Sequence, residues 1–260
     1  MKKIETLNNN NKKNIFKDAE IFSLCLFLKK ENALLIGDLH IGGEESLNAS
    51  GLFIPRKNFE KVIKELGFVF SKTGKVKTVF LMGDVKHGFG LPNRQEFAEI
   101  NLLFDFLAER SEKITIIKGN HDNYLEMIVI GAKTRLGREI NVKKSEILGK
   151  RKEIFLIHGD EIKKAPKNVK LIIIGHEHCA ITLRDFAKSE KFKCFIKTKI
   201  CGTKVIAMPS LNFIATGTDL STEEPLSPYL KEMKEFECWV VEDEKSFYFG
   251  KIKKIRTQNR

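Results

Sequence analysis

The sequence predicts a protein of the α/β class, and two patterns carry this prediction. Short apolar runs recur along the chain, each bounded by Gly or a polar residue. Their apolarity is continuous rather than alternating, which is typical of strands buried on both faces. Amphipathic helical patterns separate the first of these runs, so the chain begins with the strand–helix order that right-handed crossovers produce.

The strands are predicted in chain order from these runs. The first, "IFSLCLFL" (21–28), is read as one strand, since it is far shorter than the roughly 20 residues that span a bilayer. The remaining runs are "ALLIG" (33–37), "TVFLMG" (78–83), "ITIIKG" (114–119), "IFLIHG" (154–159), "LIIIG" (171–175), "VIAMP" (205–209) and "CWVV" (238–241).

Two helices are predicted between the early strands, over 58–70 and 93–110, and Asn93 and Glu96 of the second have the spacing of a capping box. Beyond residue 135 the pattern turns mostly to β, with 138–159 read as a hairpin and 192–207 as a strand pair. The apolar helical positions are Phe59, Val62, Ile63 and Leu66 in the first helix and Phe97, Ile100, Leu103, Phe104 and Leu107 in the second.

Nothing in the 260 residues resembles an interdomain linker or an internal repeat, so we predict one domain over residues 19–253. Residues 1–18 form a polar lead-in, flexible or a peripheral strand, and residues 254–260 form a basic, solvated tail. The five cysteines lack any C-x-x-C pair, which favours free thiols in a reducing cytoplasm over disulfides or a zinc knuckle. No apolar run is long enough to span a membrane.

The formal net charge of +12 favours polyanionic partners such as nucleic acid. The lysines are spread along the whole chain, however, and a lysine-rich proteome would produce the same balance. Charge alone therefore leaves a nucleic-acid partner open.

Polar side chains follow successive predicted strands at the point where each strand ends. All six histidines of the chain belong to this set. Loops at the carboxyl ends of neighbouring strands share one crevice in an open α/β sheet, so these side chains can meet there. In order, they are Asp38 and His40; Asp84 and His87; Asn120, His121 and Asp122; His158; and His176 and His178.

Each of these residues alone has an ordinary structural reading, as a turn residue or a packed histidine. Taken together, imidazole, carboxylate and amide oxygen without thiolate favour Mn, Fe, Zn or a similar ion. The set exceeds the needs of one ion but suits two ions about 3.5–4 Å apart that share a carboxylate, an arrangement that supports displacement at phosphorus.

The series D-x-H, GD-x-x-H, GNHD, H, GHEH over residues 37–178 resembles the calcineurin-like metallophosphoesterases. The pieces "GDLHIGGEESLNASGLFIPR" (37–56), "GDVKHGFG" (83–90) and "MPSLNFIATGTDL" (208–220) resemble the ICC-like phosphoesterases, found in archaea and beside bacterial DNA-repair ligases. The resemblance implies a β-sandwich of two sheets flanked by helices, a four-layer α/β/β/α arrangement, with a dinuclear site at one edge.

The resemblance also implies roles for individual residues. One metal would take Asp38, His40, Asp84 and His178, and the other Asp84, Asn120, His158 and His176. A water bridging the ions, with its pKa lowered by them, would be the nucleophile. His121 would protonate the leaving oxygen or stabilise the phosphoryl group, oriented by Asp122. Many relatives have Asp or Asn where this chain has His87, so Lys86 and His87 either contact substrate phosphate or support the ligands. Asn212 is a further candidate to line the pocket.

The resemblance favours a metal-dependent phosphodiesterase with two divalent ions, Mn²⁺ first and Fe, Zn, Co or Ni as alternatives. Its substrate would be a phosphodiester, with nucleic acid among the candidates, and DNA-repair enzymes are candidate partners. Two alternatives keep the same fold: a phosphomonoesterase or pyrophosphatase, and a non-catalytic scaffold of the kind found in retromer. A third is a nucleic-acid tether that uses its basic surface. The presence of His121 and of every ligand position argues against the scaffold, and the sequence leaves the oligomeric state open.

Overall fold

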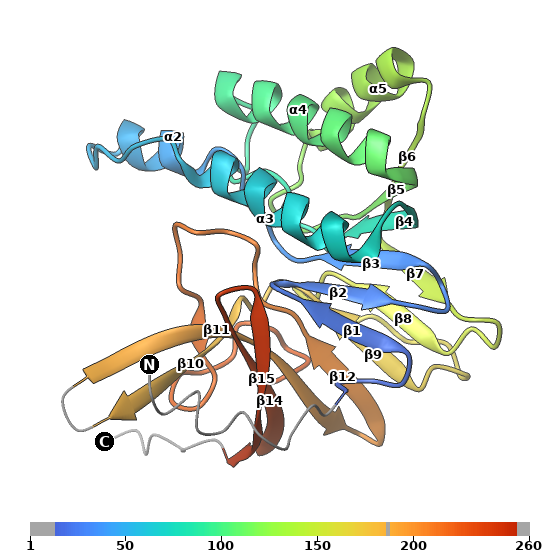
Figure 1. Cartoon of the computed structure of the whole chain (residues 1–260), viewed down its shortest axis with the longest axis vertical. Coiled ribbons are helices and arrows are strands. Elements are labelled where there is room, and N and C mark those ends of the chain that lie inside the picture. Colours follow the sequence, from blue (N-terminus) through green and yellow to red (C-terminus); the bar gives the residue numbers. More distant parts are fainter. Residues whose placement is uncertain (1–13, 186–187, 254–260) are drawn as a thin grey trace.

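The computed structural model describes residues 14–185 and 188–253, and it contains two β-sheets with helices along one side (Figure 1). The predicted basic tail and most of the predicted lead-in lie outside the described residues. Residues 14–18 of the lead-in belong instead to the packed structure, because Ile15 is buried in the core and its carbonyl oxygen accepts a hydrogen bond from Lys197 Nζ. Within the described part of the chain, no helix is both long and apolar enough to cross a membrane.

The first sheet has the order β1-β2-β3-β4-β5-β6, and the strands β3 to β6 are parallel neighbours. The helices α3, α4 and α5 lie along its outer side (Figure 1). The bounds are β1 Ala19–Phe22, β2 Cys25–Leu28, β3 Ala33–Ile36, β4 Val76–Leu81, β5 Ser111–Ile117, β6 Glu139–Lys143, α2 Gly43–Ala49, α3 Asn58–Thr73, α4 Arg94–Arg110 and α5 Leu125–Leu136.

Both predicted helices are confirmed as α3 and α4, and Asn93 and Glu96 form the predicted capping box at the start of α4. The prediction that Phe97 lies on the apolar face of this helix is wrong, because Phe97 is 54% exposed. Ile100, three residues further on, is fully buried as predicted. The helix α5 was not predicted. Its N-cap is Tyr124, which makes no side-chain capping bond, so the usual signal for a helix start is missing.

The second sheet has the order β13-β10-β11-β12-β9-β8-β7, with β14 paired to β11 and to β15. Its central strands are buried on both faces: Leu156 packs in the core between the sheets and Phe155 in a second cluster on the outer face. The bounds are β7 Ser145–Leu148, β8 Ile154–Ile157, β9 Leu171–Ile174, β10 Cys179–Asp185, β11 Lys188–Ile200, β12 Thr203–Ala207, β13 Thr218–Asp219, β14 Glu235–Glu242 and β15 Lys245–Lys253.

Three predictions about the strands need correction. The run 21–28 is not one strand but the hairpin β1–β2, turned at Ser23, whose φ is 50°. The predicted hairpin over 138–159 consists only of β7 and β8, since β6 joins the first sheet beside β5. The expected helical layer over the second sheet is absent from the described residues; there an irregular segment supplies Leu230 and Met233 to the outer cluster instead.

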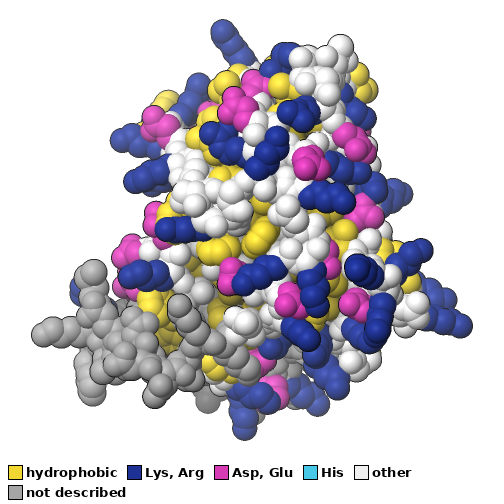
Figure 2. Space-filling model, turned by 45° about the vertical axis from the view of Figure 1, so that its right-hand side comes forward, with side chains coloured by type: hydrophobic (Ala, Val, Ile, Leu, Met, Phe, Trp, Pro, Cys, Tyr) yellow, Lys and Arg dark blue, Asp and Glu magenta, His cyan; other side chains and the backbone are white. Residues whose placement is uncertain are grey.

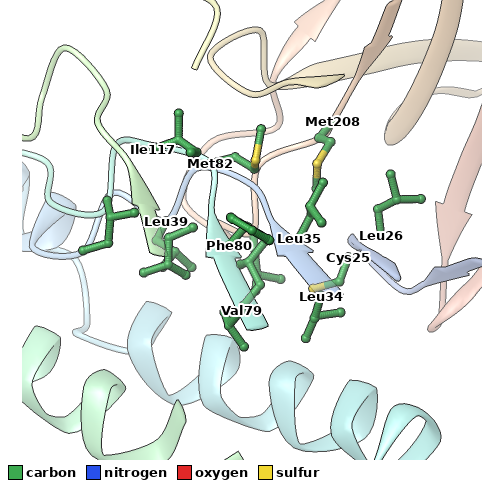
Figure 3. Packing of buried hydrophobic residues seen from close by; sticks show 14 of the residues in the cluster. Cys25, Leu26, Leu34, Leu35, Leu39, Val79, Phe80, Met82, Ile117 and Met208 are labelled. Carbon is green, nitrogen blue, oxygen red and sulfur yellow. The ribbon is translucent and has the colours of Figure 1, made fainter. Parts of the chain in front are cut away.

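The apolar core lies between the layers and fixes where the two sheets meet (Figure 3). Leu35 of β3 and Phe80 of β4 are buried in it, and so are Met82 and Met208, which follow β4 and β12. Burial of an apolar side chain of this size contributes about 1.5–3 kcal/mol to stability. The residues that follow β3 and β4 are therefore held rigidly against the second sheet.

Candidate metal centre

The predicted ligands follow strands whose carboxyl ends lie at one edge of the molecule. β3, β4 and β5 are parallel neighbours in the first sheet, and β8 and β9 are parallel neighbours in the second. A hydrogen bond of 2.8 Å between His158 Nδ1 and Met82 O joins the two edges. The predicted ligands from both sheets are therefore brought together, as expected for loops at the ends of parallel strands.

Asp38, His40 and His178 form a first group, in which the ligand atoms lie within 4.8 Å of one another. The distance between His40 Nε2 and His178 Nε2 is 3.1 Å, and His178 Nε2 lies 3.6 Å from Asp38 Oδ1. The Asp38 carboxylate is fully buried and accepts a hydrogen bond from the backbone N–H of His176.

Asp84, His158 and His176 form a second group within the same limit. His158 Nε2 lies 3.2 Å from His176 Nδ1 and 3.2 Å from the amide oxygen of Asn120. His158 Nδ1 donates to a carbonyl oxygen, so Nε2 is the ring nitrogen that faces this group.

The Asp84 carboxylate lies between the two groups. Its Oδ2 is 3.3 Å from His158 Nε2 in the second group and 3.7 Å from His40 Nε2 in the first. Asp84 Oδ1 is held by the backbone N–H of His121 at 2.9 Å. One oxygen is thus fixed by the chain and the other is directed to both sets of imidazoles.

The backbone is strained at this site. His40, Asp84, His176 and His178 have φ between 45° and 61°, a region that non-glycine residues occupy at a cost of order 1–3 kcal/mol each. The neighbouring glycines allow close approach: a Cβ on Gly83 would lie 2.2 Å from His158 Nδ1, and one on Gly119 would lie 2.2 Å from Asp84 Oδ1. Such strain persists only where the surrounding structure holds it, which is typical of functional sites.

The two buried carboxylates, Asp38 and Asp84, make positive charge favourable at this site. Burial alone would lower the pKa of His158, but its hydrogen bond to Asp84 and the charges of Asp38 and Asp84 outweigh burial and raise that pKa to about 10. Burial and the adjacent His178 lower the pKa of His40 to about 3. Burial would raise the pKa of Asp38, yet His178 and His158 beside it lower it below its ordinary value.

This donor set fits divalent cations. Pairs of imidazole nitrogens face each other at 3.1 Å and 3.2 Å, a contact between lone pairs that is repulsive unless a proton or a cation is shared. His40 Nδ1 is buried and lacks a hydrogen-bond partner among the described residues. Nitrogen and carboxylate donors without thiolate suit Mn, Fe, Zn, Co or Ni, and the two groups linked by Asp84 suit a pair of ions.

His121 lies beside the first group, with its ring 4.8 Å from that of His40. Its Nδ1 is hydrogen-bonded to His87 O, so this carbonyl orients the ring. The expectation that Asp122 orients His121 is corrected by these contacts. The buried Asp122 carboxylate accepts hydrogen bonds from Val85 N at 2.8 Å and Gly119 N at 2.9 Å, which ties together the loops after β4 and β5. Burial raises the pKa of Asp122 to about 7.

The three residues proposed to bind substrate occupy different surroundings. The Lys86 side chain is fully buried and its ammonium donates to Gly88 O and, at 3.0 Å, to Gly90 O, contacts that favour support of the loop over binding of substrate. The Asn212 amide is also buried and donates to Leu39 O at 3.0 Å. His87 remains at the site, with its ring 5.4 Å from that of His40.

Sequence reasoning missed two contacts of the loop that follows β4. The ring of Phe89 stacks on the His121 ring with centroids 3.9 Å apart. Glu96 accepts hydrogen bonds from His87 N and Gly88 N in addition to its capping bond. Glu96 carries the signal of a capping box, but nothing in the sequence marks its second role. No pattern of residue types identifies the Phe89 stack.

Comparison with known proteins adds two findings. A family model described as "Calcineurin-like phosphoesterase" matches residues 32–167, a segment that includes every predicted ligand except His176 and His178. The crystal structure of the Pseudomonas putida nuclease MPE is similar, with a TM-score of 0.61 and 16% identity over 86% of this chain and 91% of that chain. No curated protein matches the sequence. At 16% identity, the structural likeness shows a shared fold.

Proposed function

We propose that this chain, which belongs to the calcineurin-like phosphoesterase family, hydrolyses phosphodiester bonds with two divalent cations. Family membership makes it a metal-dependent phosphoric ester hydrolase. The proposal adds the preference for diesters, the pair of ions and Mn²⁺ as the native metal. Its main support is the position of Asp84 Oδ2, within 3.7 Å of an imidazole from each ligand group.

In this proposal the first cation is held by Asp38, His40 and His178, the second by Asn120, His158 and His176, and Asp84 is shared. When bound, the two ions supply Lewis acidity toward the phosphoryl oxygens and the attacking water. The buried carboxylates of Asp38 and Asp84 contact the imidazoles and hold them in place.

His121 is proposed to donate a proton from Nε2 to the leaving oxygen. Its Nδ1–H donates to His87 O, and this bond holds the ring in one orientation for the transfer. The ring then lies 4.8 Å from that of His40, beside the first ligand group. Asp122 acts at a distance, because it holds the backbone that carries Asp84 and His121.

The proposal further specifies that the substrate is a nucleic acid, which would give the protein a role in DNA processing or repair. Its support is the net charge of +12 and the shared fold with a protein described as a nuclease. On the face in Figure 2, Lys and Arg side chains are scattered among Asp and Glu, and no histidine is visible. Positive charge scattered in this way attracts a polyanion but does not direct it to one binding surface.

The test compares bis-p-nitrophenyl phosphate with p-nitrophenyl phosphate, using metal-stripped protein to which Mn²⁺ is returned. We expect diester turnover that requires Mn²⁺ and falls by a factor of about 100 or more in His121→Ala and Asp84→Ala. Asp105→Ala is the matched control, since Asp105 lies in an exposed ion pair with Arg135 on α5. Preference for the monoester would assign a phosphatase, and metal binding without turnover would assign a scaffold.

A further inference from the structure

The loop that follows β4 presents one apolar ring to solvent beside the candidate metal centre. Phe89 is 59% exposed, although one face of its ring is covered by the His121 ring at 3.9 Å. Its outer face is therefore free for a ligand. A planar group resting on that face would be separated from His121, the residue proposed to protonate the leaving oxygen, by the Phe89 ring.

This ring is held in place by the loop around it. Glu96 Oε1 accepts hydrogen bonds from His87 N at 3.1 Å and Gly88 N at 2.7 Å, and the buried Lys86 ammonium donates to Gly88 O and Gly90 O. The residues on both sides of Phe89 are thus fixed by two charged side chains. A platform fixed in advance costs little conformational entropy when a ligand binds.

Flat aromatic rings bind nucleobases by stacking, and this contact is open only to a base that is not paired within a duplex. We propose that the outer face of Phe89 is a stacking platform for an unpaired nucleobase next to the scissile phosphate. The enzyme then acts on single-stranded or frayed nucleic acid in preference to paired strands. This inference rests on the proposed diester hydrolysis and specifies its substrate class.

The test measures kcat/KM for a single-stranded oligonucleotide, for the same strand with abasic sites at its cleaved bonds, and for methyl p-nitrophenyl phosphate, which has no base. In Phe89→Leu, which keeps an apolar side chain against His121 but removes the flat ring, the ratio of oligonucleotide to base-free activity should fall about tenfold to hundredfold. Phe89→Trp should restore the ratio. Phe97→Leu, at an exposed phenylalanine of α4, is the matched control and should leave it unchanged.

Binding is followed separately from turnover by the fluorescence of a strand that contains 2-aminopurine. Stacking on Phe89 should quench this fluorescence in the wild-type protein and in Phe89→Trp, and less in Phe89→Leu. DNA and RNA strands are compared in parallel, because both carry the base chemistry that is proposed.

Three results would overturn the inference while leaving diester hydrolysis intact. In the first, Phe89→Leu loses as much kcat/KM on the base-free diester as on the oligonucleotide. In the second, the wild-type protein cleaves the abasic strand as fast as the strand that carries bases. In the third, it cleaves fully paired strands as fast as single strands. An equal loss would assign Phe89 to the positioning of His121 alone. If the wild-type protein hydrolyses no diester at all, the proposed function fails, and Phe89-dependent quenching still decides whether the platform binds bases.

Discussion

The partly buried side chain of Lys193 gives a prediction whose size follows from the structure. Lys193 lies on β11, and its Nζ donates hydrogen bonds to Ser210 O at 2.9 Å and to Ser210 Oγ at 2.7 Å, both neutral acceptors. Burial lowers the pKa of Lys193 from the ordinary 10.5 to about 8, against the attraction of Asp38. The folded protein therefore binds this proton less tightly than the unfolded chain does.

The sign of the pH dependence follows from linkage. Below pH 8 both states carry the proton, and keeping it in the folded state costs about 3.4 kcal/mol, since each pKa unit is worth about 1.36 kcal/mol. As the pH rises through 8 toward 10.5, the folded state loses the proton first and the cost disappears. Between pH 7 and about pH 9.5 the cost should fall by about 2 kcal/mol.

The assay compares the melting temperatures of the wild-type protein and Lys193→Met at these two pH values. A change of 2 kcal/mol corresponds to about 4–8 °C in melting temperature for a chain of this size. The melting temperature of the wild-type protein, relative to that of Lys193→Met, should therefore rise by this amount between the two pH values. Lys199→Met, at an exposed lysine of the same strand, is the control. A difference between wild type and Lys193→Met that does not change with pH would refute the reasoning.

Four further predictions concern the site. Lys86→Met leaves Gly88 O and Gly90 O without their charged donor, which should cost about 1.5–3 kcal/mol in thermal unfolding and lower kcat for the diester about tenfold, because the loop that orients His121 loosens. Unchanged kcat would show that the loop does not need this anchor. Gly83→Ala combines a φ of 102° with a Cβ 2.2 Å from His158 Nδ1, so the melting temperature should fall by about 6 °C or more, a loss of about 3 kcal/mol. A stable, active variant would contradict the close approach of the two sheets. Mn²⁺ at about 100 times its Kd should raise stability by about 2.7 kcal/mol for each ion bound, and chelation should reverse the gain; calorimetry that finds no gain would contradict metal binding. Asn212→Ala should weaken Mn²⁺ binding in a titration while KM for the diester changes little, whereas a rise in KM alone would favour a substrate contact instead.

The site could be predicted from sequence because its chemistry is concentrated at strand ends. Continuous apolar runs located β3, β4, β5, β8 and β9, and the polar residues after each run are the ones that the structure brings together. His158 shows the limit of this reasoning. Alone it has no distinguishing neighbour, and only its position after a buried strand marks it.

What could not be predicted depends on contacts that residue types do not encode. The β1–β2 turn has neither Gly nor Pro, and the apolar Leu24 within it makes the hairpin look like one strand. Asp122 has the residue type expected beside a catalytic histidine, but both of its oxygens accept from backbone N–H groups. The exposed ring of Phe97 occupies a position that helical periodicity assigns to the core, because periodicity does not reveal where a neighbouring layer ends.

The segment after β12 has a role that links the first prediction to the site. The Asn212 amide holds Leu39 O, between two predicted ligands, and Thr218 N donates to His178 O at 3.1 Å. Ser210 of the same segment accepts both bonds from Lys193. One segment therefore braces the first ligand group from behind, and the Lys193 ammonium anchors that segment at a cost in stability.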